Sequence, residues 1–306
     1  MSEATLHFRP FGSSLTLETA SAEVIAAVRE GLGRYPEALE IGGALTITAG
    51  VHAGGSDDPG WPTVAADLDA EGLMIRCGSS QAIVRFGAGV ADMSFAASML
   101  PIADGVRLFL EAAFTSIHVH HARLVAVHSA MVSRDGVGVM LRGPSGAGKS
   151  TLSYSCLRRG MSITSDDWLY AAAKRPAGWF AGYPWRMLMT DEAAARFPEL
   201  ADHASVPHTS AEGHKVAISP PDSQQVELQD VRAVVIVDPD GPLALRAVSA
   251  TEAIERFWAA ALPTEREHIS TEWVRGLLTD RTYVLGRGAS PDDAAAVLDD
   301  LAVSLR

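Results

Sequence analysis

The sequence predicts an α/β protein in two parts: a smaller β-rich α+β part, then a larger α/β part with a mixed sheet. Three observations predict it. Short apolar runs with period-2 alternation fill roughly the first 95 residues, strand-like and helix-like runs alternate in the remainder, and one glycine-rich loop joins a strand to a helix. We place the boundary after residue 100, which gives domains 1–100 and 101–306.

Composition and charge narrow the class of protein. Of the 306 residues, 47% are hydrophobic and 20% are charged, which is typical of a globular protein with a sizeable core. The net charge of −12 argues against nucleic acid and anionic membranes as partners. Two cysteines favour a reducing compartment, and the first residues lack a secretory signal pattern. We therefore expect a cytoplasmic protein that has no membrane or nucleic-acid partner.

The elements of the first part follow from local patterns. Residues 4–17 alternate loosely, as a strand does, and residues 21–33 have helical spacing with Ser21 as N-cap and Gly33 near the end. Three further strands are expected at 44–50, 73–78 and 82–87.

The second part begins with a helix over 104–122 and continues with a β-hairpin. The runs 124–132 and 136–143 are apolar and flank the turn residues Ser133 to Gly136. The later elements are a helix from the glycine loop to Arg159 closed by Gly160, strands at 161–165, 232–239 and 282–288, a helix over 250–262, and a final helix with Ser290 as N-cap and Pro291 in its first turn.

The glycine-rich loop matches the phosphate-binding pattern G-x-x-x-x-G-K-[ST] without mismatch. Glycines let the backbone approach an anion, and successive N–H groups at the helix start point at its oxygens. Lys149 is expected to reach the β- and γ-phosphates of ATP, and the Ser150 hydroxyl to hold Mg²⁺. The alternative is a structural glycine turn. The cofactor-binding residues are Gly143, Pro144, Ser145, Gly146, Ala147, Gly148, Lys149, Ser150 and Thr151.

Two common classes of P-loop protein do not fit the rest of the chain. An ABC-type ATPase needs an LSGGQ-like signature and an apolar strand that ends in Asp-Glu, and the strand 232–238 ends instead in VIVDPDG. Small GTPases need an N-K-x-D guanine reader, and the sequence has none.

An acidic pair follows the loop closely. The pair Asp166-Asp167 begins 16 residues after Ser150, at the end of the next strand. Adjacent residues at a strand end point in different directions, so one carboxylate can face a metal ion while the other faces an acceptor hydroxyl. Kinase chemistry needs both functions. A turn or a helix cap is the alternative interpretation.

The stretch 125–171, VAVHSAMVSRDGVGVMLRGPSGAGKSTLSYSCLRRGMSITSDDWLYA, resembles the core of the HPr serine kinase/phosphorylase superfamily, whose P-loop is related to that of ATP-dependent phosphoenolpyruvate carboxykinase. A looser likeness extends to residue 306. The resemblance implies that Asp166 is the general base and that Asp167 and Ser150 contact Mg²⁺, with the order of the two Asp roles open. It also places His128 near the phosphates, whereas a hydrogen-bonded core histidine is an equal alternative.

The chain departs from the family after the Asp pair. The Arg-Gly-Leu-Gly-type loop of true HPr kinases is missing, which leaves the acceptor and the reverse phosphorylase activity open. The sequence there looks like that of HPr-kinase-like proteins from biosynthetic clusters, among them kinases that phosphorylate the C-terminal serine of lasso-peptide precursors. The resemblance thus implies a peptide or small-protein substrate, and family members often form homo-oligomers.

Two cations and a histidine cluster complete the candidates. Arg186 lies in the strand-like run YPWRMLM, and Lys215 follows a Pro/Ser/Gly-rich loop that is a candidate lid over the transferred group. The alternatives are an arginine paired with a carboxylate and an ordinary surface lysine. The HVHH run at 118–121 has no clear third metal ligand, which favours a core or solvated helix end.

The sequence therefore favours an ATP- and Mg²⁺-dependent kinase that acts on a serine hydroxyl, with Asp166, Lys149, Arg186, Lys215 and His128 as catalytic residues. A small-molecule hydroxyl kinase on the same core is one alternative. A nucleotide-gated binding protein that transfers nothing is another. The first domain, 1–100, is expected to bind the acceptor or an assembly partner.

Overall fold

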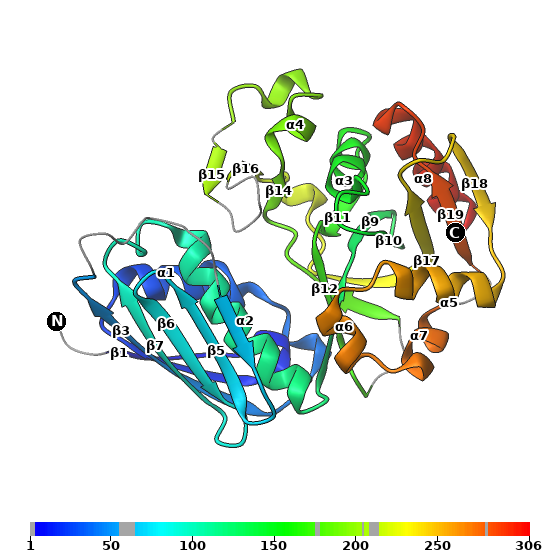
Figure 1. Cartoon of the computed structure of the whole chain (residues 1–306). Coiled ribbons are helices and arrows are strands. Elements are labelled where there is room, and N and C mark those ends of the chain that lie inside the picture. The colour runs from blue at the N-terminus through cyan, green and yellow to red at the C-terminus, as the bar shows by residue number, and fades with distance from the viewer. Residues whose placement is uncertain (1–3, 55–64, 175–177, 204, 208–213, 279–280) are drawn as a thin grey trace. The chain divides into compact units, whose positions relative to one another are not determined.

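The computed structural model is an α/β protein (Figure 1). It describes residues 4–54, 65–174, 178–203, 205–207, 214–278 and 281–306. The chain divides into two compact units. The first unit comprises Met1–Leu124 and Ala204–Lys215, and the second comprises Val125–His203 and Val216–Arg306.

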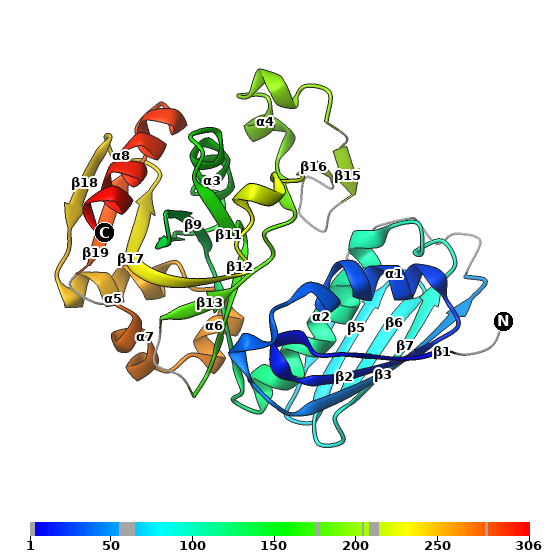
Figure 2. The ribbon, with the colours of Figure 1, turned by 180° about the vertical axis from the view of Figure 1, so that it is seen from behind.

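The first unit is built on a seven-stranded sheet. Figure 2 shows its helices α1 and α2 lying against this sheet. Its strand order is β1-β2-β3-β7-β6-β5-β4; the pairs β2–β3 and β3–β7 are parallel and the other pairs are antiparallel. The elements are β1 (Ala4–Phe8), β2 (Ser14–Thr19), α1 (Ala22–Glu30), β3 (Ala44–His52), β4 (Ala65–Leu68), β5 (Gly72–Cys77), β6 (Ser80–Arg85), β7 (Val90–Ala96) and α2 (Ala103–His120).

The helix α2 belongs to the first unit, whereas the sequence analysis placed residues 101–124 with the second part. Its apolar stripe explains the difference, because Val106, Phe109 and Phe114 are fully buried and the helix packs against α1, β5 and β6. An amphipathic helix is assigned by the sheet that covers its apolar face, and sequence periodicity does not say which sheet that is.

The second unit is built on a nine-stranded mixed sheet. Its main order is β11-β9-β10-β17-β13-β12-β8, and β19 lies beside β17 and carries β18 on its other side. The strands are β8 (Leu124–His128), β9 (Ala130–Arg134), β10 (Val137–Arg142), β11 (Ser162–Ser165), β12 (Trp168–Ala172), β13 (Trp179–Ala181), β17 (Leu228–Asp238), β18 (Ala244–Ala247) and β19 (Thr282–Gly286).

Both faces of this sheet are covered, which explains its unbroken apolar strands. In β10, Val139 and Leu141 pack in one cluster with side chains from α3 and α8, while Met140 points to the other face, in a cluster with α5 and α7. The helices are α3 (Lys149–Arg158), α5 (Ala250–Ala259), α6 (Pro263–His268), α7 (Thr271–Leu277) and α8 (Pro291–Ser304).

Several local predictions are confirmed by the structure. Ser21 and Ser290 cap α1 and α8 by accepting hydrogen bonds from Val24 N and Asp293 N. The β9–β10 hairpin turns through Asp135 and Gly136, both at positive φ, as a two-residue turn of type I′ requires. Gly160 (φ 80°) follows α3 as expected.

The prediction of a single strand over residues 124–132 is wrong. It forms two strands that separate at Ser129: β9 pairs with β10, while β8 lies at the far end of the sheet next to β12. The apolar pattern of a sequence does not indicate which strands each half of the run pairs with.

A small substructure completes the second unit. Strands β14 (Met187–Met189) and β16 (His214–Ile218) pair antiparallel, with Leu188 opposite Ala217, and α4 (Asp191–Ala194) packs on them. The strand β15 (Ser205–Pro207) is counted with the first unit. In the part of the chain that the structure describes, no helix has the length and apolarity to cross a bilayer.

Candidate functional site

The glycine-rich loop lies between β10 and α3, in the strand–loop–helix setting that its sequence predicts. Gly146 and Gly148 have φ of 79° and 92°, a region that side chains disfavour. Ala147 is buried in the core of the unit and holds the loop down. The N-cap of α3 is Gly148, which supplies no side-chain cap, so the first N–H groups of the helix remain suited to an anion.

Lys149 is the first residue of α3, and its ammonium group turns back onto the loop. The Nζ atom donates hydrogen bonds to the carbonyl oxygens of Gly143 (2.9 Å) and Pro144 (3.2 Å). Burial lowers the pKa of Lys149 to about 8, while Asp167 and Asp166 act in the opposite direction. The charge of this lysine thus stands in a desolvated place, where it acts strongly on an anion.

The acidic pair reaches the same edge of the sheet as the loop. Strand β11 is antiparallel to β9, which is antiparallel to β10, so β11 and β10 run in the same direction. Their carboxyl ends, which carry Asp166 and the loop, therefore lie on one side. Both carboxylates raise the pKa of Lys149, Asp167 more strongly. The two acids are therefore within electrostatic reach of the lysine.

The two acids have different surroundings. Asp166 is only 7% exposed, and its Oδ2 accepts a hydrogen bond from Leu188 N at 3.2 Å. The side chain of Asp167 is 60% exposed, and its Oδ1 lies 3.0 Å from Nε2 of His128. One carboxylate is thus held in the protein while the other remains open to solvent.

His128 ends β8, and the fold brings it to Asp167. Its main chain is held on both sides, because its N–H donates to Glu265 Oε1 (3.0 Å) and its carbonyl accepts from Arg142 (2.9 Å). The ring lies beside Trp168, with 5.4 Å between ring centroids. The structure therefore places His128 next to one acid of the pair.

Behind these residues lies a buried ion pair that the sequence analysis missed. Arg142, the last residue of β10, donates to both carboxylate oxygens of Glu265 at 2.7 and 3.2 Å, and both side chains are almost fully buried. Glu265 also accepts from Leu262 N, and Arg142 stacks over the Phe257 ring. A charged residue at the end of a buried apolar strand, such as VGVMLR, is a signal of a buried pair. Its partner in α6, 123 residues away, has no local signal.

One candidate cation precedes β14, and the other lies in β16, the strand that pairs with β14. Arg186 directly precedes β14 and is half-buried, two residues before the Leu188 amide that holds Asp166. Lys215 is the second residue of β16 and is counted with the first unit. Its role and that of Arg186 stay predictions, and most of the candidate lid, residues 208–213, lies outside the described residues.

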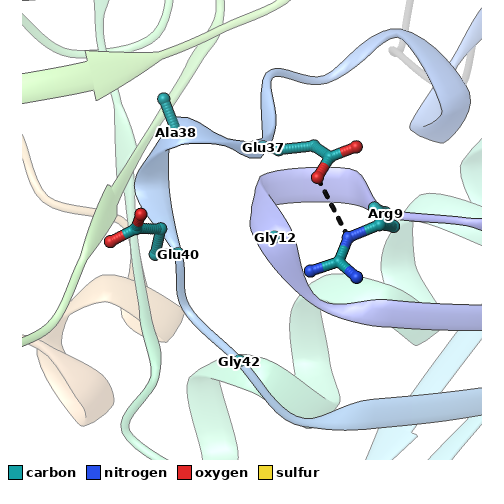
Figure 3. Close-up of a pocket in the computed structure, with 6 residues that line it drawn as sticks. All are labelled: Arg9, Gly12, Glu37, Ala38, Glu40 and Gly42. Atoms are coloured by element: carbon teal, nitrogen blue, oxygen red, sulfur yellow. Dashed lines mark ion pairs between the residues drawn. The ribbon is translucent and has the colours of Figure 1, made fainter.

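The first unit has a small pocket and one buried histidine as its candidate features. Its pocket of about 280 Å³ is lined by Arg9, Gly12, Glu37, Ala38, Glu40 and Gly42 (Figure 3). The Arg9–Glu37 ion pair (2.9 Å) is about two-thirds exposed. Of the HVHH run, His118 is buried and bonded to Ser13 Oγ at 2.9 Å. Within the described ranges, no three His, Cys, Asp or Glu side chains come together as metal ligands.

Comparison with known proteins gives distant structural likeness only. No family model matches the chain, and no curated protein matches its sequence. Among solved structures, it is similar to the HPr(Ser) kinase/phosphatase from Coxiella burnetii, with 12% sequence identity over 58% of this chain and 97% of that chain. The TM-score is 0.31. At these values the match says nothing about the chemistry of this chain.

Proposed function

We propose that the chain is an ATP- and Mg²⁺-dependent phosphotransferase, and that it transfers the γ-phosphoryl group to a serine hydroxyl of a peptide or small protein. One observation carries the proposal. The ammonium group of Lys149, buried at the glycine loop, lies within electrostatic reach of both Asp166 and Asp167. A cation, a nest of amides and two carboxylates at one sheet edge are what phosphoryl transfer needs.

The loop fits the phosphates of ATP. Positive φ at Gly146 and Gly148 and the uncapped start of α3 leave amide N–H groups for phosphate oxygens. In this structure the Lys149 ammonium group bonds to two loop carbonyls. Those bonds are exchanged for phosphate contacts when the nucleotide binds.

The residues present also fit Mg²⁺. Ser150 lies in the first turn of α3 and is half-buried, and the exposed Asp167 carboxylate supplies a second hard oxygen ligand. When bound, the ion would neutralise charge on the phosphates. His128 holds the orientation of Asp167 through the 3.0 Å contact.

Asp166 is proposed as the general base. It is buried and its carboxylate accepts a hydrogen bond from Leu188 N, so its orientation is fixed within the protein. It accepts the proton of the serine hydroxyl while the new O–P bond forms and the bond to the β–γ bridging oxygen breaks, which leaves ADP. Arg186, two residues before Leu188, is proposed to stabilise charge on the transferred group.

The acceptor class rests on the sequence. The departure from HPr kinases after the Asp pair, together with the likeness to kinases of biosynthetic clusters, favours a peptide serine. The most specific acceptor that we propose is the C-terminal serine of a lasso-peptide precursor.

The experiment uses γ-labelled ATP with Mg²⁺ and three acceptor sets: peptides with a serine, including a C-terminal one, matched peptides with alanine, and small-molecule alcohols. We expect label on serine peptides only, and at least about a hundredfold less label with K149M, because the loop lysine holds the transferred group. Label on small alcohols only would replace the proposed acceptor. Nucleotide binding without any labelled product would end the kinase assignment and leave a nucleotide-gated binder.

A further inference from the structure

A second cation lies against the glycine loop, and the proposed mechanism does not use it. Arg287 directly follows β19 and is half-buried. A Cβ atom built on Gly148 would lie 2.9 Å from an Nη1 atom of Arg287 and 3.2 Å from its Cδ. The arginine side chain therefore lies over Gly148, the N-cap residue of α3.

The strand end holds the backbone of this arginine in place. Arg287 N donates to Asp238 O at 3.0 Å, and Gly288 N donates to Gly241 O at 3.1 Å. The preceding Gly286 packs so closely on Pro242 O that a Cβ would lie 2.0 Å from it. Strands β17 and β19 are parallel, as are β10 and β17, so Arg287 starts at the same edge of the sheet as the loop.

The charge of Arg287 has no acidic partner among the described residues. Arg134, Arg142, Arg158 and Arg246 each bond a carboxylate, and no ion pair within the described ranges involves Arg287. Its neighbour is the start of a helix, which carries a partial positive charge and repels a cation. An arginine that is kept in such a place is stabilised when an anion binds beside it.

Gly148 shows where along the loop Arg287 lies. The Nη1 atom of Arg287 lies next to this glycine, which is the N-cap of α3. In a loop of the pattern G-x-x-x-x-G-K-[ST], the backbone holds the α- and β-phosphates and the lysine reaches the β- and γ-phosphates. Arg287 therefore lies against the part of the loop that is suited to the α- and β-phosphates.

We propose that Arg287 binds the nucleotide through its α- or β-phosphate oxygens and takes no part in the transfer of the γ-phosphoryl group. The inference rests on the proposed nucleotide site. It makes Arg287 a binding residue that raises the affinity for the diphosphate portion, which ADP and ATP share, so the two nucleotides depend on it equally.

The test measures Kd for Mg-ADP and Mg-ATP by calorimetry with the full chain and with R287Q, R287K and R275Q. Arg275 is an exposed arginine of α7 and serves as the matched control. We expect R287Q to weaken both nucleotides alike, by about ten- to a hundredfold, because it removes charge-assisted hydrogen bonds. R287K recovers part of the loss, R275Q changes nothing, and the melting temperature of unliganded R287Q stays within about 2 °C of the unsubstituted protein.

The other outcomes distinguish a failure of the proposed function from a failure of the role proposed for Arg287. If the unsubstituted chain binds neither nucleotide, the proposed function fails. If it binds both and R287Q binds them equally well, this inference is overturned and the proposed function stands. A loss for ATP alone would move the contact to the γ-phosphate and overturn the assignment. A destabilised R287Q with an R287K of unchanged affinity would reduce Arg287 to a packing residue.

Discussion

The two units treat buried polar groups in opposite ways. In the first unit, His118 is buried with one hydrogen bond to Ser13, and burial lowers its pKa to about 4, so the ring stays neutral. In the second unit, the buried polar side chains include ionisable ones: Arg142, Glu265, Lys149 and Asp166. Arg142 and Glu265 neutralise each other, whereas Lys149 begins α3 and Asp166 directly follows β11.

The difference shows that burial alone does not mark a functional site. A single neutral group within an apolar core is satisfied by one partner and contributes to packing. Charged groups that converge on one sheet edge are costly to bury, and a fold keeps them where a ligand or a reaction uses them. On this comparison the proposed chemistry is centred on the glycine loop and the acidic pair of the second unit.

The largest effect on stability is expected from Glu265→Gln. The substitution leaves Arg142 buried without a countercharge, which costs about 3–5 kcal/mol of unfolding free energy. Urea unfolding measures this cost. Glu267→Gln, an exposed site on the same helix α6, is the matched control and should change stability by less than about 0.5 kcal/mol. Equal small effects at the two positions would contradict the role of the buried pair.

The next largest effect is the pH dependence of the unfolding free energy that comes from His118 in the first unit. The folded pKa of His118 is about 4 and lies below its unfolded value, so the unfolded state binds the proton more readily. Stability is therefore full above about pH 6.5 and is lost as pH falls toward 4; between pH 7.5 and 5.0 the loss is about 2 kcal/mol.

His118→Gln removes this contribution to the pH slope, whereas His7→Gln, at an exposed strand position, should keep the slope of the unsubstituted protein. Urea unfolding at the two pH values gives the comparison. If all three proteins lose the same stability on acidification, the neutral buried histidine is not what separates the first unit from the second.

The smallest effect is expected at a partly exposed ion pair of the second unit. Arg134 bonds both oxygens of Asp299 in α8 and the carbonyls of Arg159 and Gly160 at the end of α3. Arg134→Met should cost about 1–2 kcal/mol, and less at high salt, because the pair is reached by solvent.

Thermal melting at low and high salt tests this value. Arg232→Met is the control, because Arg232 pairs with Asp230 in a more exposed place (3.0 Å, 54% exposed). A cost at Arg134 that does not exceed the cost at Arg232, or that does not fall with salt, would contradict the contrast between exposed and buried charges.

Local features of this fold were predictable from sequence, and long-range ones were not. The glycine loop, the acidic pair 16 residues later and the caps at Ser21 and Ser290 depend on neighbours in the chain. The Arg142–Glu265 pair and the contact of Arg287 with Gly148 join segments more than a hundred residues apart. Ser129 separates two strands that lie in different parts of the sheet, and only pairing partners decide such a split.

The central claim is that Asp166 takes the proton of the acceptor hydroxyl, and the direct test is Asp166→Asn. The amide side chain can still accept from Leu188 N, so the fold and the loop should be retained. We expect ATP affinity within about twofold of the unsubstituted protein and a transfer rate lower by about 10²- to 10⁴-fold, the usual contribution of a general base. Unchanged transfer by this variant in a single-turnover assay would contradict the account.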